Sequence, residues 1–315
     1  CMTMYVHTED GKKDFVRELT RKCFVNGIRI KNVQHLSKKN GRNAIVFQAR
    51  TVGRSCVAAK KVVPVLTEVL RSGYYDSNRR IINEEYHQYI FIQEDRFKLL
   101  SGVARMNKGK SHFNGDNFLI SRLECGKAIA AIADGMGSGK RAYIESRMVI
   151  ELMENCIDAG FDEKASIDLI NSAYIAGGGT GNPVTMDMSV IDCQSGYMHC
   201  MKLGAVSTFI RRDKWVEIIQ STTLPMGVLE QVDYDCTTKK LYDGDYIVMV
   251  SDGVLDNIPC VNKEERMAQM IHALTIREPS AMAEKLLEQS LAYNDMKASD
   301  DCTVLVLGLF DTYEK

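Results

Sequence analysis

Two kinds of apolar spacing mark the first 95 residues as a small mixed module. Apolar residues recur at helical intervals in Lys12–Cys23 and again in Cys56–Leu70. They alternate with polar residues, as in half-buried strands, over 28–33, 43–49 and 89–92. Pro64 lies inside the second helical pattern and is expected to end or kink that helix. The pattern predicts an α/β segment over residues 1–95, with no catalytic constellation in it.

The second part of the chain, residues 96–315, has a longer series of elements. A helix pair is expected over 140–160 and 163–174, and the final stretch Thr303–Phe310 is apolar enough for a buried closing strand. Alternation predicts hairpins within 207–219 and within 234–251. Many antiparallel strands with two helix pairs indicate a layered α+β fold, in which two sheets pack face to face under helices.

The strand-to-helix junction at Ala128–Lys140 is the most informative stretch of the sequence. An apolar run ends on Asp134, and Gly135, Gly137 and Gly139 follow in alternation before a basic helix begins. A carboxylate at the end of a core strand, beside bare glycine backbone, suits a metal ion. The alternative is a simple turn whose Asp caps the following helix.

Composition excludes several classes of function. The 315 residues carry a net charge near −1, so no basic field attracts nucleic acid or anionic lipid. The ten cysteines are scattered without zinc spacing, which is typical of reduced thiols in a cytosolic protein. No apolar run approaches the roughly 18 residues of a membrane span. Because the chain begins with Cys1, we expect it to be a portion of a longer protein.

Four places share one arrangement, in which an apolar strand meets an Asp beside a small or turn residue. The carboxylates concerned are Asp116, Asp134, Asp252 and the neighbours Asp300 and Asp301. Carboxylates gathered at one end of a sandwich repel each other, and a divalent cation relieves that repulsion. All the donors are oxygens, so Mg²⁺ or Mn²⁺ fits better than Zn²⁺. The glycine-rich loop Gly177–Gly181 lacks the Gly-Lys-Ser/Thr sequence of a nucleotide-binding loop.

Three segments in order carry a family resemblance. They are Asp134-Gly135-Met136-Gly137-Ser138-Gly139, Ser251-Asp252-Gly253-Val254-Leu255-Asp256 and Asp300-Asp301-Cys302-Thr303-Val304. Together they resemble the metal-dependent PPM (protein phosphatase 2C-like) serine/threonine phosphatases, and within them the stage II sporulation protein E group. The resemblance covers residues 96–315 and implies the PPM fold there. Residues 1–95 resemble, more weakly, the regulatory segment that precedes the phosphatase domain in that group.

The resemblance also implies roles for individual residues. Asp134 would bridge two Mn²⁺ or Mg²⁺ ions, the carbonyl of Gly135 would be a further ligand, and Asp134 and Asp252 would be the residues essential for catalysis. The remaining protein ligands would be Asp116, Asp252 and Asp300. Asp301 and Asp187 would be supporting or structural residues, with a place on the solvent side of a strand as the alternative for Asp187. No basic residue for the phosphate is assigned, although Lys140 and Arg141 follow Asp134 closely.

The function implied is hydrolysis of a phosphoserine on an anti-anti-sigma-type protein in sporulation or stress control. Hydroxide activated by two metal ions would attack phosphorus in line. The resemblance further implies control by the helix pair and homodimerisation through the regulatory segment. We expect a cytoplasmic protein, or the soluble part of a membrane-anchored one, with no nucleic acid or membrane contact. The alternatives are a phosphatase-fold binding module with little catalysis, and a small-molecule sensor in residues 1–95 with an unrelated metal-binding output.

Overall fold

Two compact units make up the chain. The structure, a computed structural model, describes residues 12–36, 42–53, 56–81, 86–109, 111–123, 125–176, 182–213 and 215–312. Unit 1 comprises the described residues of Cys1–Arg96 and Glu124–Gly126, and unit 2 those of Phe97–Leu123 and Lys127–Lys315. The Gly177–Gly181 loop lies outside the described residues. None of the helices in these ranges combines the length and apolarity needed to cross a membrane.

Unit 1 is a four-stranded antiparallel sheet with two helices. Its elements are α1 (Lys12–Val25), β1 (Ile28–Leu36), β2 (Ala44–Thr51), α2 (Ala59–Leu70), β3 (Tyr74–Ile81) and β4 (His87–Gln93), and the strand order is β1-β2-β4-β3. Leu19 of α1 and Leu66 of α2 are buried in one apolar cluster with Phe47, Tyr89 and Phe91 of the sheet. The predicted α/β segment is therefore present, and β3 is a strand that the apolar pattern did not indicate.

Pro64 does not end α2, so of the two expected effects of this proline, an end or a kink of the helix, the first is wrong. The helix runs from Ala59 to Leu70 with Pro64 inside it. A proline removes the amide that would bond the carbonyl four residues earlier, here that of Lys60. Lys60 is exposed in the first turn, so water can satisfy its carbonyl while Val62, Val65 and Leu66 stay packed in the core.

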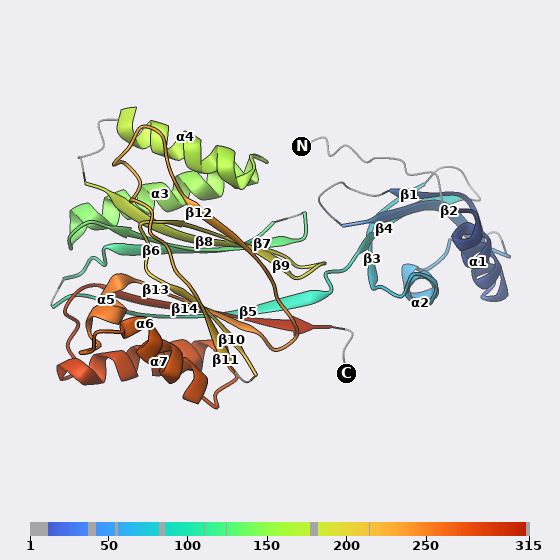
Figure 1. The fold of residues 1–315 in the computed structure, drawn as a ribbon. Coiled ribbons are helices and arrows are strands. Elements are labelled where there is room, and N and C mark those ends of the chain that lie inside the picture. Colours follow the sequence, from blue (N-terminus) through green and yellow to red (C-terminus); the bar gives the residue numbers. More distant parts are fainter. Residues whose placement is uncertain are drawn as a thin grey trace. The chain divides into compact units, whose positions relative to one another are not determined.

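Unit 2 is a sandwich of two five-stranded antiparallel sheets (Figure 1). One sheet has the order β11-β10-β13-β14-β5, and the other has the order β12-β9-β8-β7-β6. The strands are β5 (Phe97–Met106), β6 (Asp116–Arg122), β7 (Lys127–Gly135), β8 (Val184–Asp192), β9 (Tyr197–Leu203), β10 (Thr208–Arg212), β11 (Trp215–Ile219), β12 (Asp235–Lys240), β13 (Tyr246–Val250) and β14 (Cys302–Asp311).

Three apolar layers hold the sandwich together. Between the sheets, Ile132 and Ile191 of one sheet meet Ile247 and Leu305 of the other. Helices α3 (Lys140–Asp158) and α4 (Glu163–Ala176) cover the outer face of the β7 sheet. The outer face of the β13 sheet is covered by α5 (Asp252–Asp256), α6 (Lys263–Ala273) and α7 (Pro279–Leu291), and η1 (Ala292–Asn294) follows α7. This arrangement confirms the predicted α+β fold.

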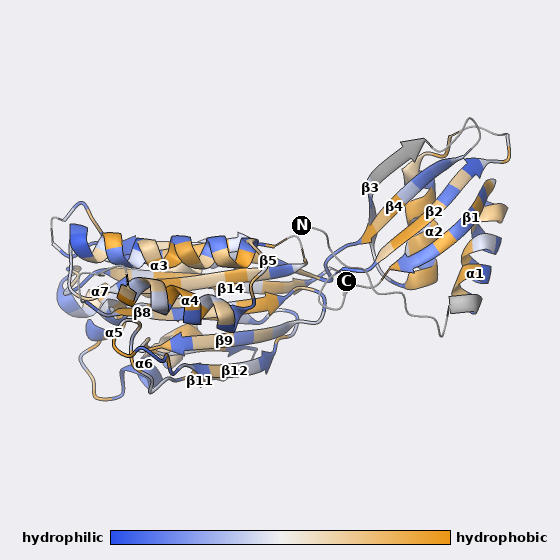
Figure 2. Cartoon of the chain, turned by 90° about the horizontal axis from the view of Figure 1, so that it is seen from above, coloured by the Kyte–Doolittle hydropathy of each residue, from blue (hydrophilic) through white to orange (hydrophobic). Residues whose placement is uncertain are grey.

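The helix pair begins and ends close to the predicted residues. Hydrophilic and hydrophobic residues alternate along α3 (Figure 2), and its chain leaves the helix at Gly160, whose φ of 89° favours glycine. Asp162 caps α4 by accepting a hydrogen bond of 2.8 Å from the amide of Ala165. Leu169 of α4 is exposed although it is apolar, because the inner face of the helix is occupied by other residues, among them Asn171, which accepts a hydrogen bond from the amide of Gly227.

The segments around Asp243-Gly244 do not form the predicted hairpin. β12 pairs with β9 in one sheet, whereas β13 pairs with β10 and β14 in the other. The connection therefore carries the chain from one sheet of the sandwich to the other. Two alternating stretches joined by a turn look the same in sequence whether they pair with each other or with other strands.

Candidate metal centre

Strand ends bring Asp116, Asp134 and Asp252 together at one end of the sandwich. Asp116 begins β6 and lies directly opposite Asp134, which is the penultimate residue of β7. Asp252 follows β13 in the facing sheet and begins α5. Asp134 interacts by side-chain contact and by charge with both of the other carboxyl groups. Asp134 is therefore the shared member of two carboxyl pairs.

The alternative reading of Asp134 as a helix cap is wrong. The N-cap position of α3 is occupied by Gly139, and no side chain caps that helix end. Asp134 instead lies in the space between the two sheets, on the same strand face as Ile132.

Burial and mutual repulsion raise the pKa values of these carboxyl groups. Burial, followed by the charges of Asp116 and Asp252, raises the pKa of Asp134 to about 10. Burial is also the main cause that raises the pKa of Asp116, to about 6, and that of Asp252. Burial and repulsion make the ionised form of these carboxyl groups unfavourable, and a bound cation would offset that cost.

Asp116 supplies a second, independent sign of a missing positive partner. Asp116 is 1% exposed, and neither of its carboxyl oxygens accepts a hydrogen bond of normal geometry from the described residues. The hydroxyls of Thr303 and Ser251 lie close enough to lower its pKa. Buried polar atoms are rarely left without partners, so two such oxygens at once fit the ligand set of a hard cation.

The carboxyl groups contact each other in pairs and do not form a complete coordination sphere around one point. Among the residues that the structure describes, no three His, Cys, Asp or Glu side chains are arranged to hold one ion together. The pairs Asp116/Asp134 and Asp134/Asp252 would be the protein groups that hold divalent cations, with backbone carbonyl and water as the remaining ligands. The donor chemistry therefore fits Mg²⁺ or Mn²⁺, which prefer oxygen ligands and keep several waters.

Gly135 allows α3 to approach the end of β7. A Cβ atom on Gly135 would lie 2.4 Å from the carbonyl oxygen of Ala142 in the first turns of the helix. The amide of Gly135 donates to the carbonyl of Gly115 at 3.4 Å, next to Asp116. The glycine thus places backbone, rather than a side chain, beside the carboxyl groups.

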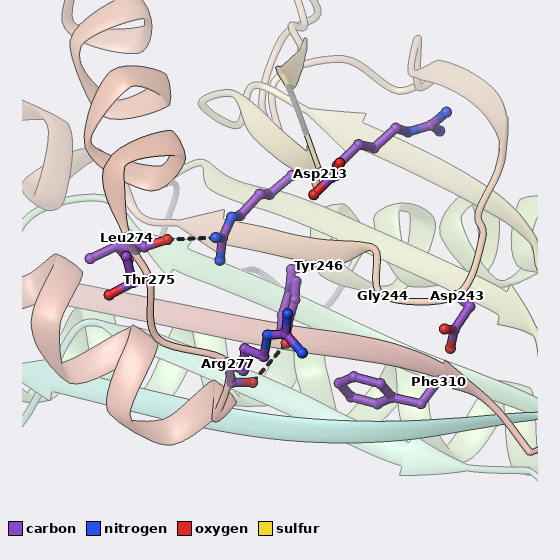
Figure 3. A pocket seen from close by; sticks show the side chains of 10 residues that line it. Asp213, Asp243, Gly244, Tyr246, Leu274, Thr275, Arg277 and Phe310 are labelled. Atoms are coloured by element: carbon purple, nitrogen blue, oxygen red, sulfur yellow. Dashed lines mark hydrogen bonds between the residues drawn. The ribbon is translucent and has the colours of Figure 1, made fainter. Parts of the chain in front are cut away.

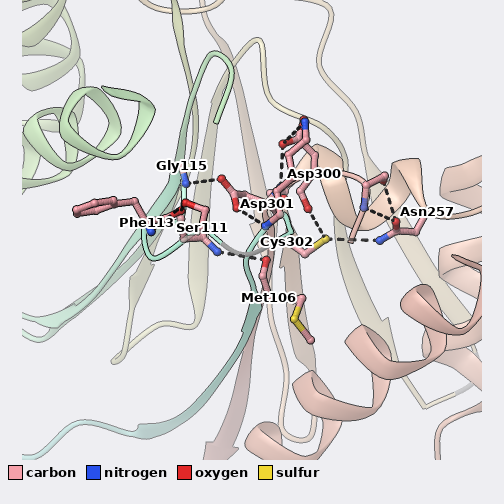
Figure 4. A network of polar contacts seen from close by, with 12 residues as sticks. Met106, Ser111, Phe113, Gly115, Asn257, Asp300, Asp301 and Cys302 are labelled. Carbon is pink, nitrogen blue, oxygen red and sulfur yellow. Dashed lines mark hydrogen bonds and ion pairs between the residues drawn. The ribbon is translucent and has the colours of Figure 1, made fainter. Parts of the chain in front are cut away.

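Asp300 and Asp301 occupy different environments, although they are neighbours. Asp301 is buried and accepts hydrogen bonds from the amides of Lys108 and Gly115, both at 2.7 Å (Figure 4). It therefore fixes the loop that leads into Asp116, which agrees with a structural role. Asp300 has a side chain that is 39% exposed, and it pairs with Lys108 Nζ at 3.5 Å. Its charge acts on Asp252.

Arg105 is a basic residue near the site that the sequence did not reveal. It lies on β5 and its guanidinium donates to the backbone carbonyl of Asp116 and, at 3.4 Å, to the hydroxyl of Thr303. Lys140 and Arg141, which follow Asp134 in sequence, are both exposed, and Arg141 pairs with Glu145 at 3.3 Å. The only sequence signal for Arg105 was a charged residue near the end of an apolar strand.

Asp187 does not lie on the solvent side of its strand. Its side chain is 3% exposed and pairs at 2.6 Å with Lys202, which is 1% exposed. Both residues point into the space between the sheets. Periodicity could not decide this, because β8 is buried on both faces.

The carboxyl groups border a small cavity, and the larger cleft lies elsewhere. A cavity of about 70 Å³ is lined by Asp134, Asp187 and Asp252. A cleft of about 580 Å³ lies where β13 begins, at the opposite end of that strand (Figure 3). Two of its arginines hold structure together, because Arg211 donates to the carbonyls of Leu274 and Ile276 and Arg212 donates to that of Lys240.

Comparison with known proteins identifies the family of the chain. The family described as "Stage II sporulation protein E (SpoIIE)" matches residues 125–310. The stage II sporulation protein E of Bacillus subtilis (strain 168) is 29% identical over 292 residues, which are 90% of this chain and 34% of that protein. The chain thus spans about a third of the length of that relative.

Solved structures give the same result. The PP2C phosphatase domain of SpoIIE from Bacillus subtilis, with a fragment of its regulatory domain, superposes with a TM-score of 0.73 at 27% identity, covering 95% of this chain and 92% of the other. RsbX in complex with magnesium superposes with a TM-score of 0.53 at 20% identity, covering 69% and 97%. At that identity, the second match shows the fold alone.

Proposed function

The chain belongs to the stage II sporulation protein E family, whose solved domain is a PP2C phosphatase, and we propose that it hydrolyses phosphoserine in a protein substrate with two bound Mn²⁺ or Mg²⁺ ions. The observation that carries the proposal is the convergence of Asp116, Asp134 and Asp252, where neither buried oxygen of Asp116 accepts a hydrogen bond of normal geometry from the described residues. When bound, the ions would activate a water molecule and offset charge on the phosphoryl oxygens.

Each residue has a distinct part in this proposal. Asp134 would bridge the ions, Asp116 and Asp252 would each hold one, and Gly135 would contribute its carbonyl. Asp300 would join them by exchanging its pairing with Lys108. Arg105 holds the backbone of Asp116 and brings a fixed positive charge to the same end of the sandwich, where a phosphoryl group would need one.

The substrate proposed is a phosphoserine on an anti-anti-sigma-type protein in sporulation or stress control. Its support is the family itself, whose described members act in sporulation. We further propose that residues 1–95 are regulatory and mediate a homodimer. These finer statements rest on the relatedness of the sequences and not on a contact in this chain.

The test is metal-dependent hydrolysis by the 315-residue chain. Phenyl phosphate esters and matched phosphoserine and phosphotyrosine peptides are incubated with Mn²⁺ or with EDTA. We expect turnover that needs metal and prefers phosphoserine. Asp134→Asn and Asp252→Asn should each lower kcat by about 100-fold or more, because each removes charge stabilisation from the reacting centre.

Glu288→Gln is the matched control. Glu288 lies on the exposed side of α7, and its carboxylate pairs with Lys285 at 2.7 Å. It should retain wild-type turnover. If Asp134→Asn and Asp252→Asn fold and remain fully active, the site assignment is wrong. A folded wild-type chain that binds Mn²⁺ but hydrolyses none of the substrates would favour the binding module.

A further inference from the structure

Asp187 of β8 and Lys202 of β9 form an ion pair inside the sandwich. Lys202 Nζ lies 2.6 Å from Asp187 Oδ2, and the two side chains are 1% and 3% exposed. Taking two charges out of water is costly, and replacing a buried pair by apolar residues is often neutral or stabilising. The stability of the fold alone therefore does not account for this pair.

One oxygen of Asp187 carries nearly all of its contacts. Oδ2 accepts bonds from Lys202 Nζ and from the hydroxyl of Thr208. Among the described residues, Oδ1 has one weak contact, at 3.8 Å from the sulfur of Cys200. Lys202 Nζ is itself fixed by a second bond of 2.6 Å to the carbonyl of Val206. The position of the Lys202 ammonium group is thus fixed, and it binds the carboxylate of Asp187 through Oδ2.

This pair adjoins the carboxyl groups of the metal centre. Asp187 lies opposite Ile132 in the β7–β8 ladder, two positions from Asp134 on the same strand face. Asp134, Asp187 and Asp252 all line the cavity of about 70 Å³. A volume of that size exceeds the share of a single water molecule, roughly 30 Å³ in the liquid. Three carboxylates therefore face one space, and among the described residues only Asp187 of these three pairs with a buried cation.

We propose that Lys202 is a positioning residue that withholds Asp187 from metal coordination and so limits the number of carboxylate ligands at the centre. This inference rests on the proposed metal site. A free carboxylate facing the cavity would be an additional hard ligand for Mn²⁺ or Mg²⁺. It would bind the ion more tightly and would occupy a position that a reacting water needs.

The test compares Mn²⁺ binding by the full chain and by Lys202→Met, using titration calorimetry. Methionine is unbranched and only one heavy atom shorter than lysine, so it keeps most of the side-chain volume and removes the charge. We expect the Mn²⁺ dissociation constant to fall by about 10-fold or more and kcat to fall as well, because Asp187 becomes available as a ligand. Unchanged or weaker Mn²⁺ binding by the folded variant would overturn the proposal.

The double variant Asp187→Asn/Lys202→Met distinguishes two explanations of the ion pair. In the first, Lys202 keeps Asp187 from binding the metal, and in the second, the pair has only a structural role. The double variant removes both charges, so the Mn²⁺ dissociation constant should return to within about threefold of wild type. If the double variant binds Mn²⁺ as tightly as Lys202→Met does, Asp187 is not the added ligand and the proposal fails.

Loss of folding in Lys202→Met also has a decisive readout. In this variant Asp187 would be an unpaired buried carboxylate, and a metal ion bound to it should stabilise the fold. Saturating Mn²⁺ should therefore restore cooperative thermal unfolding of Lys202→Met. Absence of rescue would contradict the proposal. Arg212→Met is the matched control, because it unpairs the buried Asp245, 3.6 Å away from Arg212 near the start of β13. It should lower Tm without changing Mn²⁺ affinity.

The proposed function fails on different evidence. If the wild-type chain binds Mn²⁺ but hydrolyses no phosphoester, the catalytic proposal is wrong. The binding comparison between wild type, Lys202→Met and the double variant remains decisive in that case, because none of its readouts depends on turnover.

Discussion

Asp134 is the residue on which the electrostatics of the site converge. It shares the end of the sandwich with Asp116 and Asp252, and its pKa is raised by burial first and by their charges second. Such a group opposes folding of the metal-free chain once it is ionised. The same property favours binding of a cation, because the cation relieves the repulsion that folding created.

Metal-free stability should therefore fall as the pH rises. The pKa of Asp134 is 3.8 ordinarily and about 10 in the folded chain. Between these values the folded chain holds a proton that the unfolded chain has released, so the free energy of unfolding decreases with pH. Asp134→Asn removes this effect, and in EDTA at pH 8 its Tm should exceed that of wild type by about 3 °C or more.

Calorimetry from pH 5 to 9 checks this expectation. The difference between Asp134→Asn and wild type should shrink toward pH 5, and added Mn²⁺ should raise Tm for wild type but not for the variant. A variant less stable than wild type at pH 8 in EDTA, or a difference that does not vary with pH, would contradict the electrostatic account.

At the scale of elements, close backbone contacts place the carboxyl groups. Gly253 in α5 is packed against the segment that precedes β14, where a Cβ atom would lie 2.2 Å from the carbonyl oxygen of Asp301. Asp301 in turn holds the loop before Asp116. The strand-end carboxyl groups of both sheets are thus connected through one close backbone approach, at Gly253, and one hydrogen bond from the Gly115 amide to the Asp301 side chain.

Gly253→Ala should disturb stability and metal binding together. The added methyl group meets backbone, and overpacking of this kind costs about 1–3 kcal/mol. Because α5 must move, Asp252 should move from Asp134, and Mn²⁺ affinity should fall by about 10-fold. Thermal unfolding and calorimetric titration measure both effects. Gly53→Ala, whose nearest neighbour would be a side-chain atom at 3.8 Å, is the control. Unaltered Tm and Mn²⁺ affinity in Gly253→Ala would refute the expectation.

At the scale of the molecule, each unit has an apolar core of its own. One cluster, which includes Leu19, Phe47 and Phe91, lies within unit 1. Three others, around Ile247, Val149 and Leu286, lie within unit 2. A unit with a separate core is expected to fold as a cooperative unit.

The fragment 97–315 should consequently fold without the residues before it. We expect one cooperative transition with Tm within about 3 °C of the corresponding transition in the full chain. Its Mn²⁺ affinity should stay within about threefold, because every carboxyl group of the centre belongs to unit 2. Calorimetry and Mn²⁺ titration of the fragment provide the measurement. An unfolded fragment, or one that binds no Mn²⁺ while the full chain does, would show that unit 1 completes the fold or the site.

Periodic segments were predicted well, and elements stabilised by their neighbours were not. The apolar patterns of α3, α4 and β14 predicted boundaries close to those observed. β3 has a polar sequence and is an edge strand that β4 holds through backbone pairing, which side-chain patterns do not record. The partner of β12 was also missed, because pairing with β9 depends on which strand lies alongside it in the fold.

The sequence by itself determined which carboxylates lie at strand ends, because a strand end depends only on a local apolar run and the turn that follows it. Tertiary structure decided which charges meet. It placed Asp116 opposite Asp134, brought Asp252 from the facing sheet, and buried Asp187 against Lys202. It also supplied Arg105 from β5. These pairings join residues far apart in the chain, and the low dielectric between two packed sheets gives them their energetic weight.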